Sequence, residues 1–263
     1  MSKDKKILLS FDVEEFDLPM EYKQKISIEE QLEVGYKGLV ELEAITNNLN
    51  AQFTLFTTAF FADHFPDNIK TLSRQHEIAS HTYFHSTFKE EDLKTSKEKL
   101  ETIIGKPIYG LRMPRMKFVN ADVISQAGYQ YNSSINPTWV PGRYNNLHLP
   151  RTIFSENGLM QLPVSVTPHF RIPLFWLAFK NMPYSIFLKM ALQTLRHDGY
   201  VCLYFHPWEF IDLSNYKLPF YIKTDSKKLF QKLNRLIGHL SCEGEFTAIH
   251  SFIKSKELQP VLN

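Results

Sequence analysis

Three observations predict that the sequence folds as one α/β domain. Short apolar runs typical of strands alternate with amphipathic segments typical of helices along all 263 residues. No repeat, linker or low-complexity stretch interrupts this alternation. The composition, with 43% hydrophobic and 22% charged residues, is that of an ordinary globular protein. We therefore expect residues 1–263 to form a single domain, built on a parallel sheet or an α/β barrel.

The predicted strands are short and rich in aliphatic, β-branched and aromatic residues. Residues 200–205 are apolar throughout and residues 7–11 nearly so, as expected of strands whose two faces are both buried. The predicted strands are residues 7–11, 52–57, 77–80, 108–111, 129–133, 159–164, 200–205 and 246–249.

The predicted helices carry apolar residues at helical spacing. The first follows Ser27, which opens a capping-box pattern with Glu30, and extends to about Asn47. The others are residues 68–74, 90–104, 121–127, 184–196 and 226–240. Residues 136–158 contain Pro, Gly and Asn without a clear period, so we expect them to form a long loop.

Charge and cysteine content exclude several classes of protein. Lys and Arg number 30 against 28 Asp and Glu, so there is no basic footprint and we expect no nucleic-acid partner. Two cysteines, Cys202 and Cys242, are too few for a disulfide scaffold or a zinc site built on paired Cys motifs. The apolar run at residues 7–11 is too short for a signal peptide, and no window suits a membrane span. We expect a cytoplasmic protein.

Polar side chains of complementary types follow directly on four predicted strands. In α/β folds the carboxyl ends of the strands meet on one side, where binding sites form. We therefore expect these side chains to converge. They are Asp12 and Glu14, His81 and His85, Arg112, and His206.

The His81 and His85 pair suggests a metal site. On a helical turn, residues four apart share a face and can bind one ion, although two unrelated polar histidines would give the same pattern. The strand end with Asp12 and Glu14 can supply a third, carboxylate ligand while its other acid acts as a base. Such a ligand set suits one divalent metal, above all Zn²⁺, with Co²⁺, Ni²⁺ or Fe²⁺ as alternatives.

Two further residues could have either a catalytic or a structural role. His206 follows a strand and precedes Pro207, and its expected place opposite the metal pair favours proton transfer over a buried structural role. Arg112 either forms a structural ion pair or orients a catalytic carboxylate.

Together these residues resemble the polysaccharide deacetylase family, the NodB-homology carbohydrate esterases of family four. The resemblance is ordered from about residue 7 to about residue 250. The segments that carry it are Ser10-Phe11-Asp12-Val13-Glu14, His81-Thr82-Tyr83-Phe84-His85, Arg112-Met113-Pro114-Arg115, Tyr131-Asn132-Ser133-Ser134 and Leu203-Tyr204-Phe205-His206-Pro207-Trp208-Glu209. It implies a distorted (β/α) barrel of about seven strands.

The resemblance also implies roles. Asp12 would be the catalytic base and His206 the general acid, while Arg112 contacts the base. The metal ligands would be Glu14, His81 and His85, and the substrate contacts Pro114, Trp208 and Asn132. The implied reaction is metal-assisted hydrolysis of the N-acetyl amide of an amino sugar in a glycan or glycan precursor.

The chain departs from the family pattern at two positions. Asn132 stands where the family usually has an Asp that positions and charges the general-acid histidine, so we expect the pKa of His206 to rise less. Glu14 replaces the usual Asp ligand and is one methylene longer, with Glu15 as a neighbouring competitor. These departures predict weakened activity or a changed choice of metal.

The expected cytoplasmic location favours a sugar or lipid-linked intermediate over a finished polymer. The segment from Phe170 to Leu192 is apolar and aromatic, so it could contact a membrane surface peripherally. A core helix with an apolar loop explains it equally well, because Pro173 and Pro183 interrupt a long helix.

Two other functions fit the same residues. One is a cytoplasmic amidohydrolase acting on a small ureide or a formamido sugar. The other is an inactive glycan-binding protein on the same fold, suggested by Asn132 and by the aromatic Trp139, Trp176 and Trp208.

Overall fold

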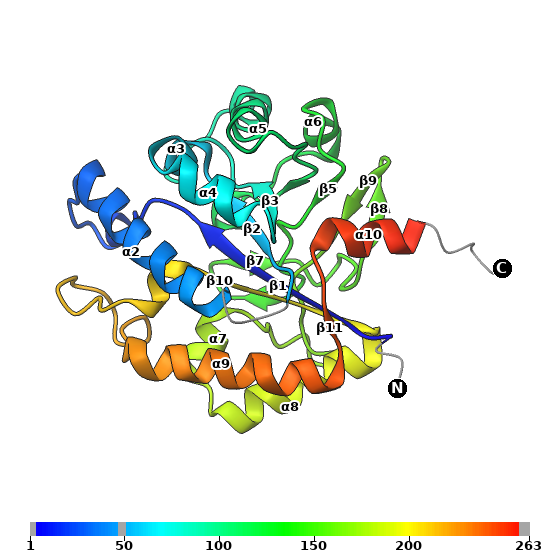
Figure 1. Cartoon of the computed structure of the whole chain (residues 1–263). Helices are drawn as coiled ribbons and strands as arrows, with labels where there is room; N and C mark the ends of the chain where they lie inside the picture. The colour runs from blue at the N-terminus through cyan, green and yellow to red at the C-terminus, as the bar shows by residue number, and fades with distance from the viewer. Residues whose placement is uncertain (1–3, 47–50, 258–263) are drawn as a thin grey trace.

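A curled, largely parallel sheet forms the centre of the computed structural model, which describes residues 4–46 and 51–257 (Figure 1). Over these residues the sheet has nine strands. They are β1 (Lys6–Val13), β2 (Thr54–Thr57), β3 (Glu77–Ser80), β4 (Gly110–Leu111), β5 (Tyr131–Asn132), β8 (Phe154–Glu156), β9 (Leu159–Gln161), β10 (Tyr200–Phe205) and β11 (Glu245–Phe246).

The strand order confirms the predicted barrel. It is β10-β1-β2-β3-β4-β5-β9-β8, with β11 also paired to β1. Neighbours from β10 through β9 run parallel, and only the β8–β9 pair of this path is antiparallel. The chain after β9 returns toward β10, where the Ser165 N–H donates to the Cys202 carbonyl over 2.9 Å. The sheet is thus a distorted (β/α) barrel. Seven consecutive strands (β10, β1, β2, β3, β4, β5, β9) are parallel, and β11 also runs parallel to β1.

Helices lie around the outside of the sheet (Figure 1). The α-helices are α1 (Leu18–Glu21), α2 (Ile28–Thr46), α3 (Ala59–His64), α4 (Pro66–Leu72), α5 (Glu91–Ile104), α6 (Ala121–Gln126), α7 (Trp176–Asn181), α8 (Tyr184–Asp198), α9 (Ser226–Glu243) and α10 (Ile249–Glu257). Two 3₁₀ turns, η1 (Pro114–Met116) and η2 (Pro207–Phe210), directly follow strand ends that carry site residues. Asn47, the predicted end of the first helix, lies outside the described residues.

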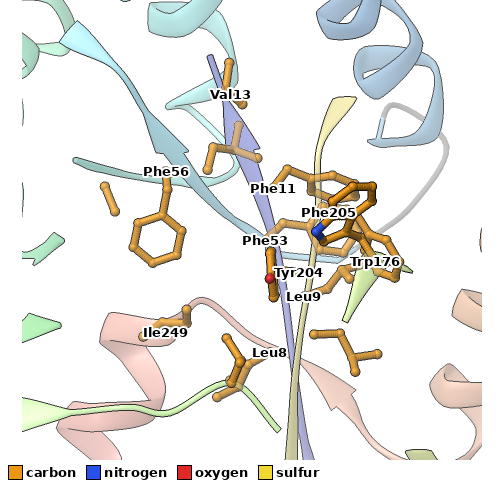
Figure 2. Packing of buried hydrophobic residues seen from close by; sticks show 14 of the residues in the cluster. Leu8, Leu9, Phe11, Val13, Phe53, Phe56, Trp176, Tyr204, Phe205 and Ile249 are labelled. Atoms are coloured by element: carbon orange, nitrogen blue, oxygen red, sulfur yellow. The ribbon is translucent and has the colours of Figure 1, made fainter. Parts of the chain in front are cut away.

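The core is densest around β1. Every residue of this strand after Lys6 is buried, because the sheet covers it laterally and other side chains cover both faces. The ring of Phe11 packs 6.0 Å from that of Phe53 and 6.2 Å from that of Phe205, centroid to centroid. Figure 2 shows these rings beside β1. Much of the aromatic content therefore stabilises the barrel itself.

Two glycines let α2 pack directly against the strand ends. A Cβ on Gly35 would lie 2.5 Å from the carbonyl oxygen of Glu14, and a Cβ on Gly38 would lie 2.6 Å from the backbone of Pro207 and Trp208. The helix begins as its capping pattern predicts, since the Glu30 N–H donates to Ser27 Oγ over 3.2 Å. The helix thus supports the backbone on both sides of the candidate site.

The predicted long loop over residues 136–158 is wrong. It contains a hairpin of β6 (Trp139–Val140) and β7 (Tyr144–Asn145), followed by β8. Each hairpin strand has only two residues, too few to show a period, and Gly142 turns the chain with φ +72°. The last predicted strand ends at Phe246, after which α10 begins at Ile249.

The segment from Phe170 to Leu192 contains α7 and the first part of α8, and several of its large side chains belong to the core. Leu174, Trp176, Phe179 and Phe187 are buried. Pro183 separates the two helices. In the described part of the chain, no helix is both long enough and apolar enough to cross a membrane.

Candidate active site

The register between β1 and β10 places Asp12 and His206 at neighbouring strand ends. Phe11 pairs with Phe205 in this parallel pair, so Asp12, the next residue of β1, lies level with His206, the first residue after β10. Nε2 of His206 lies 3.9 Å from Oδ2 of Asp12. An acid and a base predicted from distant parts of the sequence therefore face each other.

Arg112 holds the other oxygen of Asp12. Its NH1 group donates to Asp12 Oδ1 over 2.7 Å and to Ser10 Oγ over 2.9 Å. Nε donates to the carbonyl of Ser133 over 3.1 Å, and the guanidinium carbon lies 4.0 Å from the ring centre of Phe56. Arg112 is fully buried. A buried cation with these contacts fixes the orientation of the Asp12 carboxylate and compensates its charge.

Glu14, His81 and His85 form a buried cluster whose ligand atoms lie within 4.8 Å of one another. Oε2 of Glu14 is 3.1 Å from Nε2 of His81 and 3.1 Å from Nε2 of His85. Neither contact has hydrogen-bond geometry, so this buried oxygen is left without a hydrogen bond from the described residues. The structure thus brings together the three residues that the resemblance assigns to a metal.

Neighbouring groups orient each member of the cluster. Nδ1 of His81 lies 2.8 Å from the carbonyl oxygen of Arg112, and Nδ1 of His85 lies 2.8 Å from Oδ1 of Asp17. Both acceptors favour a proton on Nδ1, which leaves Nε2 facing Glu14. Trp208 donates its indole N–H to the other oxygen of Glu14, Oε1, over 3.0 Å.

Electrostatics also couple the cluster. Burial alone would raise the pKa of Glu14, but His85, His81 and His206 outweigh it and lower this pKa to about 2. Burial alone would lower the pKa of His85, and the carboxylates of Glu14 and Asp17 raise it to about 9. Without a cation the cluster therefore retains a proton on an imidazole, and metal binding would release it.

The residues fit a divalent metal. Ligands about 2.0–2.1 Å from a tetrahedral Zn²⁺ ion lie roughly 3.3 Å from one another, close to the 3.1 Å separations found here. Two imidazoles and one carboxylate form a familiar set for catalytic zinc, which keeps a fourth position for water or substrate. The unsatisfied Oε2 of Glu14 is the atom that such a cation would neutralise.

His206 takes a carboxylate partner that the sequence analysis missed. Its Nδ1 lies 3.1 Å from Oε1 of Glu209. Burial alone would lower the pKa of His206, but the hydrogen bond to Glu209 and the charges of Glu14, Glu209 and Asp12 raise it. The sequence HPWE contained the signal, since a 3₁₀ turn brings residues three apart together.

Asn132 does not lie beside His206 or the substrate cavity, where the resemblance placed it. Its side chain is buried, donates to Gln161 Oε1 over 2.8 Å and accepts from the Ser134 hydroxyl. The strand β5 turns this side chain toward β9, and Asn132 does not line the cavity described below.

The site opens into a cavity of about 270 Å³. Asp12, His206 and the three metal candidates line one part of it, and Trp208 lines it too, whereas Arg112 lies behind Asp12. Pro114 lines an adjoining groove instead. Other walls come from Trp176, one of the aromatic residues that suggested glycan binding, from Tyr204, and from the hairpin residues Val140, Arg143 and Tyr144, which the sequence did not indicate as site residues.

Residues 37–132 match the family model for polysaccharide deacetylase. This stretch contains His81, His85 and Arg112, whereas Asp12, Glu14 and His206 lie outside it. The predicted resemblance to the polysaccharide deacetylases is confirmed. A comparison with curated protein sequences finds no match.

Solved structures share the deacetylase fold at low sequence identity. A probable polysaccharide deacetylase from Pseudomonas aeruginosa PAO1 has a TM-score of 0.67 and 14% identity, covering 99% of this chain and 94% of the other. Puue allantoinase has a TM-score of 0.63 and 14% identity, covering 95% and 90%. A CE4 family pseudoenzyme from Bacillus anthracis has a TM-score of 0.51 and 12% identity, covering 93% and 63%. These likenesses establish the fold, and the site residues rest on the geometry above.

Proposed function

We propose that this protein is a metal-dependent hydrolase that removes the N-acetyl group from an amino sugar. The observation that carries the proposal is the placement of two groups of residues in one cavity. The Glu14, His81 and His85 cluster faces it, and so do Asp12, backed by Arg112, and His206. A metal site, a base and an acid are the parts that metal-assisted amide hydrolysis requires.

Each residue has a definite part in the proposed reaction. When bound by Glu14, His81 and His85, the metal would polarise the amide carbonyl and make water more acidic. Asp12 accepts a proton from the attacking water at its carboxylate, which Arg112 holds in place. His206, at Nε2, gives a proton to the departing amine.

The cavity fits a sugar unit or a chain end. Trp176, Trp208, Tyr144 and Tyr204 contribute apolar ring surface, while carboxylates and imidazoles gather at one side. Burial of Trp176, Phe179 and Phe187 removes these three rings from the apolar surface that suggested membrane contact. We therefore propose a carbohydrate that reaches the site from solution. A lipid-linked substrate and the cytoplasmic location stay predictions of the sequence.

The test begins with metal-free protein that is reloaded with Zn²⁺, Co²⁺, Ni²⁺ or Fe²⁺. Acetate release from N-acetylated mono- and oligosaccharides is measured beside the appearance of free amine, and the two should match. Asp12→Asn should lower kcat by about 10²–10⁴-fold. The matched control is Asp122→Asn on the outside of α6, which should keep full activity. Absence of bound metal, or full activity of Asp12→Asn, would contradict the proposal.

Hydrolysis of a small ureide or a formamido sugar is the second candidate. The limited volume of the cavity favours it, because about 270 Å³ suits a small molecule. The same residues would act on either amide. Ammonia or formate in place of acetate among the products would select this alternative. Metal binding and sugar binding without any turnover would select the inactive glycan-binding protein.

A further inference from the structure

A buried carboxylate and a buried ammonium lie behind His206. Glu209 is 1% exposed and lies three residues after His206, one turn along η2. Its Oε1 accepts the backbone N–H of His206 over 2.7 Å and lies 3.1 Å from Nδ1 of the same residue. The short η2 turn therefore directs one carboxylate oxygen at both the backbone and the ring of His206.

Lys180 provides the opposite charge from a different element. It comes from α7, and its Nζ lies 3.4 Å from Oε2 of Glu209. Nζ also donates to the carbonyl of Ile222 over 3.1 Å and lies 5.2 Å and 5.7 Å from the ring centres of Trp176 and Trp208. A buried lysine is costly unless it is paired, so this placement needs an explanation.

The contacts of Asn132 show that the charged partner of His206 comes from another residue. Asn132 is committed to Gln161 and Ser134, so position 132 supplies His206 with neither a charge nor a contact in this structure. The charged groups that face His206 are Asp12 and Glu14 from the end of β1 and Glu209 from η2. Of these, Glu209 contacts Nδ1, on the side of the ring away from Asp12.

We propose that Glu209, held by Lys180, is the positioning residue that orients His206 as the proton donor, in place of the residue at position 132. This inference rests on the proposed function. A carboxylate at Nδ1 selects the ring form with a proton there and points Nε2 toward Asp12 and the cavity. It also stabilises the imidazolium, in line with the raised pKa of this histidine. Lys180 fixes the carboxylate and balances its charge.

A purely structural role for Glu209 would need only its hydrogen bond to the backbone N–H of His206. Glu209→Gln separates the two roles, because the amide oxygen can still accept that N–H while the negative charge is lost. Lys180→Met removes the ammonium and keeps an unbranched side chain of similar length. Glu245→Gln on β11, more than half exposed, is the matched Glu-to-Gln control.

The experiment uses the zinc-loaded full chain with isotope-labelled histidine. The imidazole signals of His206, assigned with His206→Asn, report its proton position and its titration whether or not acetate is released. We expect His206 protonated on Nδ1 in the wild type, as its contact with Glu209 requires. In Glu209→Gln its midpoint should fall by at least about one pH unit, in Lys180→Met it should change and in Glu245→Gln it should not.

Kinetics give the second readout. On the substrate found by acetate release, Glu209→Gln should lower kcat by at least about tenfold with KM and bound zinc nearly unchanged. The alkaline limb of its pH profile should move to lower pH. Unchanged imidazole signals in Glu209→Gln, in a folded protein, would overturn the inference and leave Glu209 as a cap of η2. Failure of acetate release with the expected imidazole shifts would count against the proposed function only.

Discussion

Trp208 donates its indole N–H to Oε1 of Glu14 over 3.0 Å, which leaves Oε2 of the same carboxylate to the two imidazoles. The contact joins the end of β10 to the end of β1. Trp208 also stacks on His206, with ring centres 4.6 Å apart. One aromatic side chain therefore touches both the proposed metal ligand and the proposed general acid.

Trp208→Phe should weaken zinc binding by about 10–100-fold, because the substituted ring keeps much of the packing but cannot orient the Glu14 carboxylate. Competition with a chromophoric zinc chelator measures the affinity. Trp139→Phe, at an exposed position in the β6–β7 hairpin, is the matched control and should bind zinc like the wild type. Equal affinity of both variants would show that the indole contact is irrelevant to the cluster.

Arg112→Met should lower the free energy of unfolding by about 3–5 kcal/mol, because it leaves the buried Asp12 carboxylate without its partner. Adding Asp12→Asn removes the unpaired charge, so the double variant should be more stable than Arg112→Met alone. Urea unfolding of the metal-free proteins measures both effects. No recovery in the double variant would argue that the lost contacts to Ser10 and Ser133 dominate instead.

Gly38→Ala should destabilise the fold by about 1–3 kcal/mol, although alanine is the better helix former. The added methyl group would meet the backbone of Pro207 and Trp208. Gly238→Ala is the matched control on α9, where a Cβ meets nothing within 4 Å, and it should stabilise by up to about 1 kcal/mol. Thermal unfolding distinguishes the two. Stabilisation by both would contradict the close packing of α2 on η2.

His76 should make the protein less stable in mild acid. Burial lowers its pKa to about 4, and its Nδ1 accepts the Phe53 N–H, which a protonated ring cannot do. The unfolded chain binds a proton near pH 6.5, so stability is lost as the pH falls from about 6.5 toward 4. Between pH 7 and pH 5, His76→Gln should lose about 1–2 kcal/mol less stability than the wild type in urea unfolding. The same loss in both proteins would assign the acid sensitivity to other groups.

The sequence predicted much of the sheet and most of the site, because both are encoded locally. Buried parallel strands such as β10 are apolar at every position, and the residues that follow them are the polar ones that meet at one end of a barrel. Spacing then placed His81 and His85 beside Glu14, and the strand register placed His206 beside Asp12. These relationships depend on few long-range details.

Other features depend on contacts that a single sequence does not display. The β6–β7 hairpin consists of two-residue strands, and the chain gives no sign that it closes one wall of the cavity. The partner of His206 was sought at position 132, whereas the β5 backbone turns Asn132 toward Gln161. From the sequence, no helix is predicted over α10, although its apolar residues have helical spacing. Ile249, Phe252 and Ile253 lie on one face of this helix and are buried.

The pairing of β1 with β10 also constrains how the chain is made. The Ser10 hydroxyl donates to the carbonyl of Leu203, a partner 193 residues later. During synthesis, β1 leaves the ribosome with apolar side chains and an edge of unpaired backbone N–H and C=O groups, and this edge cannot pair with β10 until residues 200–205 have been made. Contacts of such separation slow folding and prolong the exposure of that edge. The strand β1 thus needs protection from aggregation while the nascent chain grows.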